Sequence, residues 1–202
     1  MDSVYHRHPF VVPNLVPLED CQDFAELLDD YTSSGMSMGR VESDTVVNYK
    51  SGSSDKHTYM YGEPFGQQIQ KEIQSEVEKL TGLSLKRSYV SSRKYFKGNE
   101  LYSHKDRDSC EVSVTVCIGK SDSDYSWPIY IDDGDKTSML SCDIGDGIIY
   151  AGTVHSHSRE PLEIDWYSVL LIHYVNANGP YVDSQDRIND LNMLENHTGK
   201  FS

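Results

Sequence analysis

The stretch that decides the fold of this 202-residue chain is LKRSYVSSRKYFKGNELYSHKDRDSCEVSVTVCI, residues 85–118. Apolar and polar side chains alternate through 85–96 and again through 110–118, and a period of two predicts strands. Gly98 marks a turn after the first of them. The same pattern returns downstream in 127–131, 138–144, 147–152 and 166–175. The sequence therefore predicts a β core over residues 83–176.

Helices are expected before this core. One helical face in residues 18–31 is formed by Leu18, Cys21, Phe24, Leu28 and Tyr31. A second helix, over residues 64–80, has a face made of Phe65, Ile69, Ile73, Val77 and Leu80, with Pro64 and Gly82 at its ends. Residues 33–62 are expected to form loops with one or two short strands. The polar C-terminal tail shows only a short helical tendency near 186–195.

Helices followed by successive strands indicate an α+β, mainly β fold, in which helices pack on one sheet of a sandwich or barrel core. We expect a single domain over residues 1–202. Its helical part is 1–82, its β core is 83–176 and its polar C-terminal tail is 177–202.

Composition disfavours several classes of function. The formal net charge of −14 disfavours binding to nucleic acid, because phosphate backbones repel an acidic surface. No stretch approaches 18 apolar residues, so no membrane span is expected. The four cysteines form no C-x-x-C pair, and no secretory signal is visible, which predicts free buried thiols and a cytoplasmic protein.

The first chemical motif is His104-Lys105-Asp106. Residues i and i+2 of a strand share a face, so this imidazole and this carboxylate can bind one metal ion together. The motif is common by chance and needs a third ligand from another strand. Two His and one carboxylate leave adjacent open positions on iron(II) for oxygen and a bidentate co-substrate.

The third ligand is expected in GDGIIYAGTVHSHSREPL, residues 145–162. His155, His157 and Arg159 have the same parity and would face the same interior of a regular strand. On this argument alone, His155 and His157 are both candidates for the third metal ligand. His173 lies in an apolar strand and is interpreted as a satisfied core or edge histidine, whereas His6, His8, His57 and His197 are interpreted as surface residues.

The segment from Tyr95 to Asp106 resembles the core motif of the prolyl-4-hydroxylase-like oxygenases. In that family a Tyr-x-x-Gly segment precedes H-x-D, and a distal histidine follows some fifty residues later. Here Tyr95-Phe-Lys-Gly98 precedes the pair, and His157 lies 53 residues beyond His104. The H-x-D-R-x-S-C-E and H-x-R-E-P runs look like a small bacterial and phage-type branch of these enzymes. The resemblance covers roughly residues 85–175.

The resemblance implies a double-stranded β-helix (jelly-roll or cupin-like) fold and an iron(II)- and 2-oxoglutarate-dependent dioxygenase. It also implies that the metal ligands are His104, Asp106 and His157, that O2 is consumed, and that ascorbate serves as reductant. The implied reaction is hydroxylation of an unactivated C–H bond, with a peptide, a protein or a free amino acid as substrate. Tyr95 occupies the position of the family tyrosine that hydrogen-bonds 2-oxoglutarate.

The residue that binds the distal carboxylate of 2-oxoglutarate departs from the family pattern. The family places a basic residue about ten positions after the distal histidine, but no Lys or Arg occurs between Glu160 and Asp186. A buried carboxylate needs a charge-assisted partner. Arg159 is the first choice, Arg93 the second and Arg107 the third. The alternative for Arg159 is a salt bridge with Glu160 or a rim carboxylate.

Other interpretations remain open. Trp127 and Trp166 either line the substrate pocket or belong to the core, and Glu111 is expected to orient Arg107. A non-catalytic cupin-like module that binds a metal or a small molecule is the main alternative function. A zinc hydrolase with the same ligands would need a general base, for which Glu160 and Glu163 are the candidates. Residues 33–62 and 120–137 are expected to select the substrate.

Overall fold

A computed structural model describes residues 8–34 and 58–198 of the chain. The loops and strands predicted within 35–57, and with them His6 and His57, lie outside the described residues. The helices are α1 (Leu18–Ser34), α2 (Pro64–Thr81) and α3 (Gln185–Thr198), with one 3-10 turn, η2 (Asp108–Cys110). The strands are β1 (Phe10–Val12), β2 (Thr58–Tyr61), β3 (Leu85–Phe96), β4 (Leu101–His104), β5 (Val112–Lys120), β6 (Ile129–Asp132), β7 (Thr137–Leu140), β8 (Gly147–Tyr150), β9 (Ser156–Arg159) and β10 (Trp166–Asn176).

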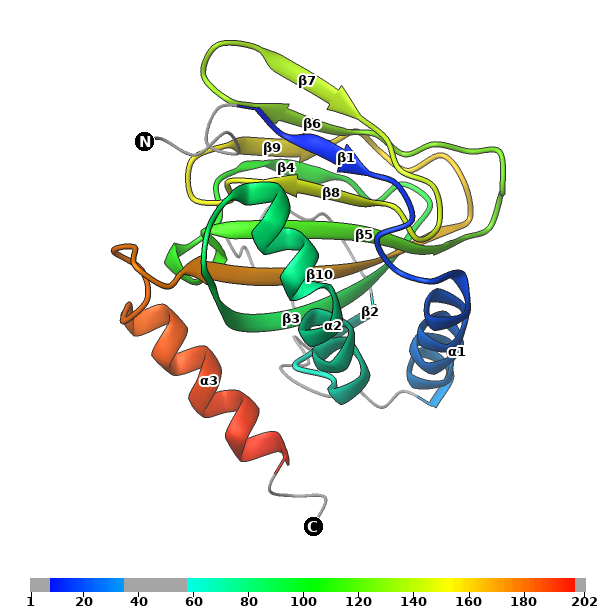
Figure 1. The fold of residues 1–202 in the computed structure, drawn as a ribbon. Coiled ribbons are helices and arrows are strands. Elements are labelled where there is room, and N and C mark those ends of the chain that lie inside the picture. The colour runs from blue at the N-terminus through cyan, green and yellow to red at the C-terminus, as the bar shows by residue number, and fades with distance from the viewer. Residues whose placement is uncertain (1–7, 35–57, 199–202) are drawn as a thin grey trace.

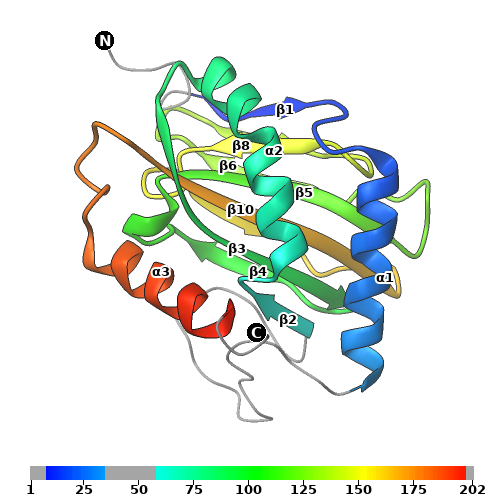
Figure 2. The same ribbon diagram turned by 60° about the horizontal axis from the view of Figure 1, so that its bottom comes forward.

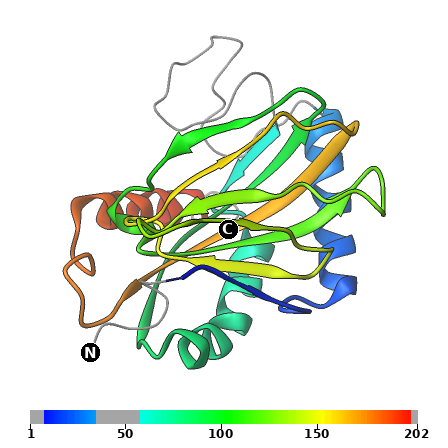
Figure 3. The same ribbon diagram turned by 90° about the horizontal axis from the view of Figure 1, so that it is seen from above.

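The strands form two antiparallel sheets. The larger has the order β1-β8-β5-β10-β3-β2, and the smaller has the order β4-β9-β6-β7. Sequence neighbours such as β4 and β5 lie in different sheets, so the chain passes repeatedly from one sheet to the other (Figures 1 and 3). This is the jelly-roll arrangement, and it confirms the predicted mainly β fold with a double-stranded β-helix core.

Alternation along β3 and β10 separates two hydrophobic clusters. Val90, Leu170 and Ile172 pack in the cluster that includes the helices. Tyr95, Tyr167 and Val169 pack in the second cluster, together with side chains of the smaller sheet. From Val90 onward in β3, and along β10 from Tyr167 to Ile172, even-numbered positions therefore face the helices and odd-numbered positions face the smaller sheet; a register shift beyond Ile172 places Leu85 on the helix side.

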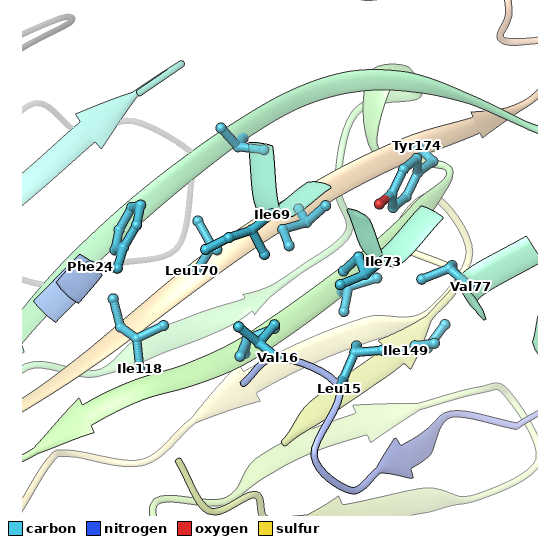
Figure 4. Packing of buried hydrophobic residues seen from close by; sticks show 14 of the residues in the cluster. Leu15, Val16, Phe24, Ile69, Ile73, Val77, Ile118, Ile149, Leu170 and Tyr174 are labelled. Atoms are coloured by element: carbon cyan, nitrogen blue, oxygen red, sulfur yellow. The ribbon is translucent and has the colours of Figure 1, made fainter. Parts of the chain in front are cut away.

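Helices α1 and α2 cover the outer face of the larger sheet (Figure 2). Ile69, Ile73 and Val77 of α2 are directed toward the strands, as Figure 4 shows. The helix begins where the Glu63 carboxylate accepts the N–H groups of residues 65 and 66, and it ends at Gly82, whose φ of 71° is left-handed. Gly82 was predicted from the sequence as the end of this helix, whereas the cap by Glu63 was not.

The face predicted for α1 is confirmed for Cys21, Phe24 and Leu28, which are fully buried. The prediction is wrong for Leu18, which is 56% exposed. Leu18 is the first residue of the helix and lies at the rim of the contact with the sheet. A helical periodicity cannot tell where along a helix the covered surface ends.

Three further features complete the fold. Helix α3 is longer than the predicted helical tendency and packs beside β3 and η2, at the edge of the larger sheet (Figure 2).

The four cysteines are buried free thiols, as predicted, whereas the cytoplasmic location inferred partly from them stays a prediction. Within the described ranges, no helix combines the length and the hydropathy needed to cross a membrane.

Candidate active site

Two neighbouring strands and one turn bring the predicted metal ligands together. β4 pairs with β9 so that His104 lies opposite His157. Asp106 follows β4, and its backbone N–H donates to the carbonyl of Gly152, 2.9 Å away, in the turn that leads from β8 toward β9. Side chains 53 residues apart in the sequence therefore meet between the two sheets.

The three side chains form a set suited to one divalent ion. The Asp106 Oδ1 atom lies 3.7 Å from Nε2 of His104 and 3.6 Å from Nε2 of His157. The ligand atoms of all three residues lie within 4.8 Å of one another. A divalent metal with bonds of about 2.1 Å to nitrogen and oxygen fits this spacing.

Hydrogen bonds select the imidazole tautomer that metal binding requires. The Nδ1 atom of His104 lies 2.8 Å from the carbonyl of Tyr102, and that of His157 lies 3.2 Å from the carbonyl of His155. A carbonyl only accepts, so both Nδ1 atoms donate, and both Nε2 lone pairs face Asp106. Burial lowers the pKa of His157 more than nearby Asp106 raises it, which favours the neutral ring.

Asp106 is held as a carboxylate. Burial alone would raise its pKa, but the His157, His173 and His104 rings and the Ser113 hydroxyl together lower the pKa below its usual value. Ser113 Oγ donates to Asp106 Oδ2 over 2.9 Å. One carboxylate oxygen is therefore occupied by the hydroxyl, and the other faces the two imidazoles.

Gly152 is a site residue that the sequence analysis missed. A Cβ atom at this position would lie 2.3 Å from the Cys110 carbonyl oxygen, 2.4 Å from Asp106 Oδ2 and 2.5 Å from Ser113 Oγ. Only glycine leaves room for the carboxylate. No local signal in the sequence distinguishes a turn glycine from one that contacts a ligand residue.

Arg159 lies on β9 two residues after His157 and is buried on the same face. Its Nη1 atom donates to the Trp127 carbonyl, and its Cζ atom lies 4.8 Å from the centre of the Trp127 ring and 5.7 Å from that of Tyr167. Its Nη2 atom is buried without a hydrogen-bond partner, and Arg159 makes no salt bridge within the described residues. The alternative of a salt bridge with Glu160 is therefore not observed.

Tyr95 and Trp127 lie beside Arg159 in the core between the sheets. Their rings are 5.0 Å apart and meet edge to face. Trp127 is only 2% exposed, and its indole N–H donates to the Glu160 carbonyl over 2.8 Å. The core interpretation thus holds for Trp127, which also contacts the guanidinium. Trp166 is on β10 next to Tyr167 and faces the opposite side of the sheet. The centre of its ring lies 4.2 Å from Lys94 Nζ on the helix side.

Arg107, the third choice for binding the co-substrate, is engaged elsewhere. Its Nη2 atom donates to Asp190 of α3 over 2.8 Å, and its Cζ atom lies 4.8 Å over the Tyr89 ring. The expected role of Glu111 is wrong. Its carboxylate accepts the backbone N–H of Asn176 over 2.7 Å and so secures the end of β10 rather than orienting Arg107.

The two other histidines near the site have different surroundings. His155 is fully buried, and its Nδ1 atom accepts the Ala151 N–H over 3.3 Å, so this candidate for the third ligand is engaged with the backbone instead. His173 is buried as predicted, with Nδ1 3.1 Å from Ser113 Oγ and its ring 4.6 Å from that of Tyr89. Glu160 and Glu163, the bases considered for a zinc hydrolase, are both exposed.

Comparisons with known proteins agree with this geometry at the level of the fold. Neither the comparison with family models nor that with curated protein sequences gives a match. Among solved structures, a Trichoplax adhaerens prolyl hydroxylase in complex with a hypoxia-inducible factor peptide has a TM-score of 0.64 at 15% identity, covering 89% of this chain and 88% of its own. A Pseudomonas putida prolyl-4-hydroxylase has a TM-score of 0.62 at 12% identity, covering 85% and 93%. The α-ketoglutarate-dependent epimerase SnoN of nogalamycin biosynthesis has a TM-score of 0.64 at 12% identity, covering 89% and 84%.

The chain therefore has the fold of the iron(II)- and 2-oxoglutarate-dependent oxygenases. Prolyl hydroxylases are among the proteins that share it. At these identities the likeness establishes the fold alone. What the chain does must follow from its own site residues.

Proposed function

We propose that this protein is an iron(II)- and 2-oxoglutarate-dependent dioxygenase whose metal ligands are His104, Asp106 and His157. One observation carries the proposal. Two imidazoles, each with Nδ1 bonded to a backbone carbonyl, direct their Nε2 atoms toward one oxygen of an ionised carboxylate. This donor set suits iron(II) and leaves adjacent coordination positions open for a bidentate co-substrate and oxygen.

Arg159 is proposed to bind the distal carboxylate of 2-oxoglutarate. A buried guanidinium with an unpaired N–H donor is costly unless an anion pairs with it. A carboxylate reaching Nη2 would make a charge-assisted hydrogen bond. The Trp127 and Tyr167 rings, whose centres lie 5.4 Å apart, both pack against the guanidinium, and Tyr95 is proposed to donate its hydroxyl to the same co-substrate.

Iron(II), 2-oxoglutarate and O2 together would supply oxidative decarboxylation to succinate and carbon dioxide, coupled to hydroxylation of an unactivated C–H bond. The side chains of this protein hold the ligand geometry and exclude water. The prolyl hydroxylases among the structural neighbours support a reaction of that kind on a peptide, a protein or a free amino acid. Ascorbate is proposed as the reductant that maintains iron(II).

The proposal is tested by binding and by turnover. Equilibrium dialysis of radiolabelled 2-oxoglutarate against the Mn(II)-loaded protein measures co-substrate affinity without turnover. Arg159→Gln should weaken this affinity by at least about tenfold, the loss of one charge-assisted hydrogen bond. Arg107→Gln, and Arg87→Gln on the exposed surface, are matched controls that should bind like the wild type.

Succinate release with iron(II), ascorbate and 2-oxoglutarate measures the reaction itself. The wild type should release succinate, and the Asp106→Ala variant should not. Tight metal binding with neither 2-oxoglutarate binding nor succinate release would refute the proposal. That result would instead favour a cupin-like module that binds a metal without turnover.

A further inference from the structure

A second guanidinium between the two sheets belongs to Arg93, which lies on the inner face of the larger sheet. It lies at an odd-numbered position of β3, as Tyr95 does, and it is opposite Tyr59 in the register of β2 with β3. Its Cζ atom lies 5.2 Å from the centre of the Tyr59 ring, and its Nη1 atom donates to the Tyr95 hydroxyl over 3.5 Å. The group is therefore held between two tyrosines on the side that faces the smaller sheet.

No carboxylate compensates this charge within the described part of the chain. The Nε atom of Arg93 is buried and has no hydrogen-bond partner. Three other cations each pair with an aspartate, Lys94 with Asp29, Lys120 with Asp143 and Arg107 with Asp190, whereas Arg159 shares with Arg93 the lack of such a partner among the described residues. In a chain with a net charge of −14, a guanidinium whose buried Nε atom has no partner among the described residues points to an anionic ligand.

Arg93 and Arg159 belong to different positions of the site. Arg159 comes from the smaller sheet, Arg93 from the larger, and the Tyr95 and Trp127 rings lie between them. One carboxylate of 2-oxoglutarate would satisfy Arg159, and the other would bind the metal. Arg93 therefore needs an anion that the co-substrate does not provide.

We propose that Arg93, beside Tyr59, binds a carboxylate of the substrate, so that the substrate class is a molecule with a free α-carboxylate. This inference rests on the proposed function. A planar guanidinium fork matches a carboxylate in geometry, and the aromatic ring beside it suits the apolar part of a small ligand. A single arginine in an acidic protein favours a monoanion over a dianionic phosphate. The carboxylate belongs either to a free amino acid or to the C-terminal residue of a peptide.

The test compares each carboxylate with its neutral amide. The Mn(II)- and 2-oxoglutarate-loaded protein is titrated with the common L-amino acids and their α-amides, and with proline-containing dipeptides that carry a free or an amidated C-terminus. Thermal midpoint shift and saturation-transfer NMR report binding, and succinate release above the rate without substrate reports turnover. We expect at least one free carboxylate to bind about tenfold or more tightly than its amide, the effect of one charge-assisted bond. Which arm responds identifies the free amino acid or the peptide C-terminus.

Arg93 variants separate this inference from the proposed function. Arg93→Gln should abolish the preference for carboxylate over amide, Arg93→Lys should retain part of it, and both should bind 2-oxoglutarate more tightly than Arg159→Gln does. A loss of 2-oxoglutarate binding in Arg93→Gln as large as that in Arg159→Gln would overturn the inference, because Arg93 would then hold the co-substrate. Equal binding of carboxylates and amides, or no binding of any carboxylate by a protein that binds 2-oxoglutarate, would also overturn it. Absence of 2-oxoglutarate binding in the wild type would instead refute the proposed function.

Discussion

Replacing Gly152 with alanine should weaken metal binding while leaving the protein folded. The added Cβ atom would lie 2.4 Å from Asp106 Oδ2, whereas ordinary contact begins at 3.4 Å, so the carboxylate must move by about 1 Å. The Cys110 carbonyl, 2.3 Å from the same Cβ, is backbone and yields less easily. The turn at residue 152 must therefore shift as well, and the Asp106 side chain, displaced from its place, loses its hydrogen bond to Ser113.

The expected loss of metal affinity follows from these contacts. Disturbing groups that orient a metal ligand costs about 10- to 100-fold in metal affinity. Overpacking also costs about 1–3 kcal/mol of stability. The affinity for Mn(II) is measured by competition with a fluorescent chelator, and the free energy of unfolding is measured separately by urea titration in EDTA.

Gly119→Ala is the matched control. Its Cβ atom would lie 3.1 Å from the edge of the Trp166 ring and would touch no proposed ligand. This variant should lose a little stability and no metal affinity. A folded Gly152→Ala protein that binds Mn(II) as tightly as the wild type would refute the argument that this glycine makes room for Asp106.

Two more predictions concern buried titratable groups. Burial lowers the pKa of His173 from 6.5 to about 4, so the unfolded chain binds a proton that the folded chain excludes between these values. In EDTA the free energy of unfolding should therefore fall by about 3 kcal/mol through this residue from pH 6.5 to pH 4; urea titrations of His173→Gln should lack that part of the slope, and an unchanged slope would contradict the assignment. Asp190, fully buried, accepts hydrogen bonds from Tyr61 and Arg107, so Asp190→Ala should cost about 3 kcal/mol of stability. Thermal unfolding compares this variant with Asp183→Ala, which changes an exposed residue. Equal stability of the two variants would show that the contacts of Asp190 contribute little to the stability of the fold.

Local patterns in the sequence were sufficient for most individual elements. The period of two over residues 85–96 matches the bounds of β3, and α2 ends within one residue of its prediction. The reason is physical. Alternation and helical periodicity follow from which side of one element is buried, and capping residues such as Glu63 and Gly82 act on the backbone next to them.

The ligand set was predictable in kind but not in geometry. Spacing and resemblance pointed to His104, Asp106 and His157, and left His155 open as an alternative. Only the pairing of β4 with β9 places His104 opposite His157, and only the bond from Ala151 to His155 shows that this ring is engaged elsewhere. Pairing between strands fifty residues apart depends on the packing of the whole core, which no local pattern encodes.

The sequence by itself determined the type of most elements and the chemical types of the metal-binding residues, because both depend on near neighbours in the chain. The tertiary structure alone decided which arginine is free to bind an anion. Arg107 is paired with Asp190, 83 residues away, whereas Arg159 and Arg93 keep unpaired donors between the sheets. It also decided that Gly152 must lack a side chain. Whether a charge finds a partner, and whether an atom has room, are properties of distant segments brought together, so only the folded chain determines them.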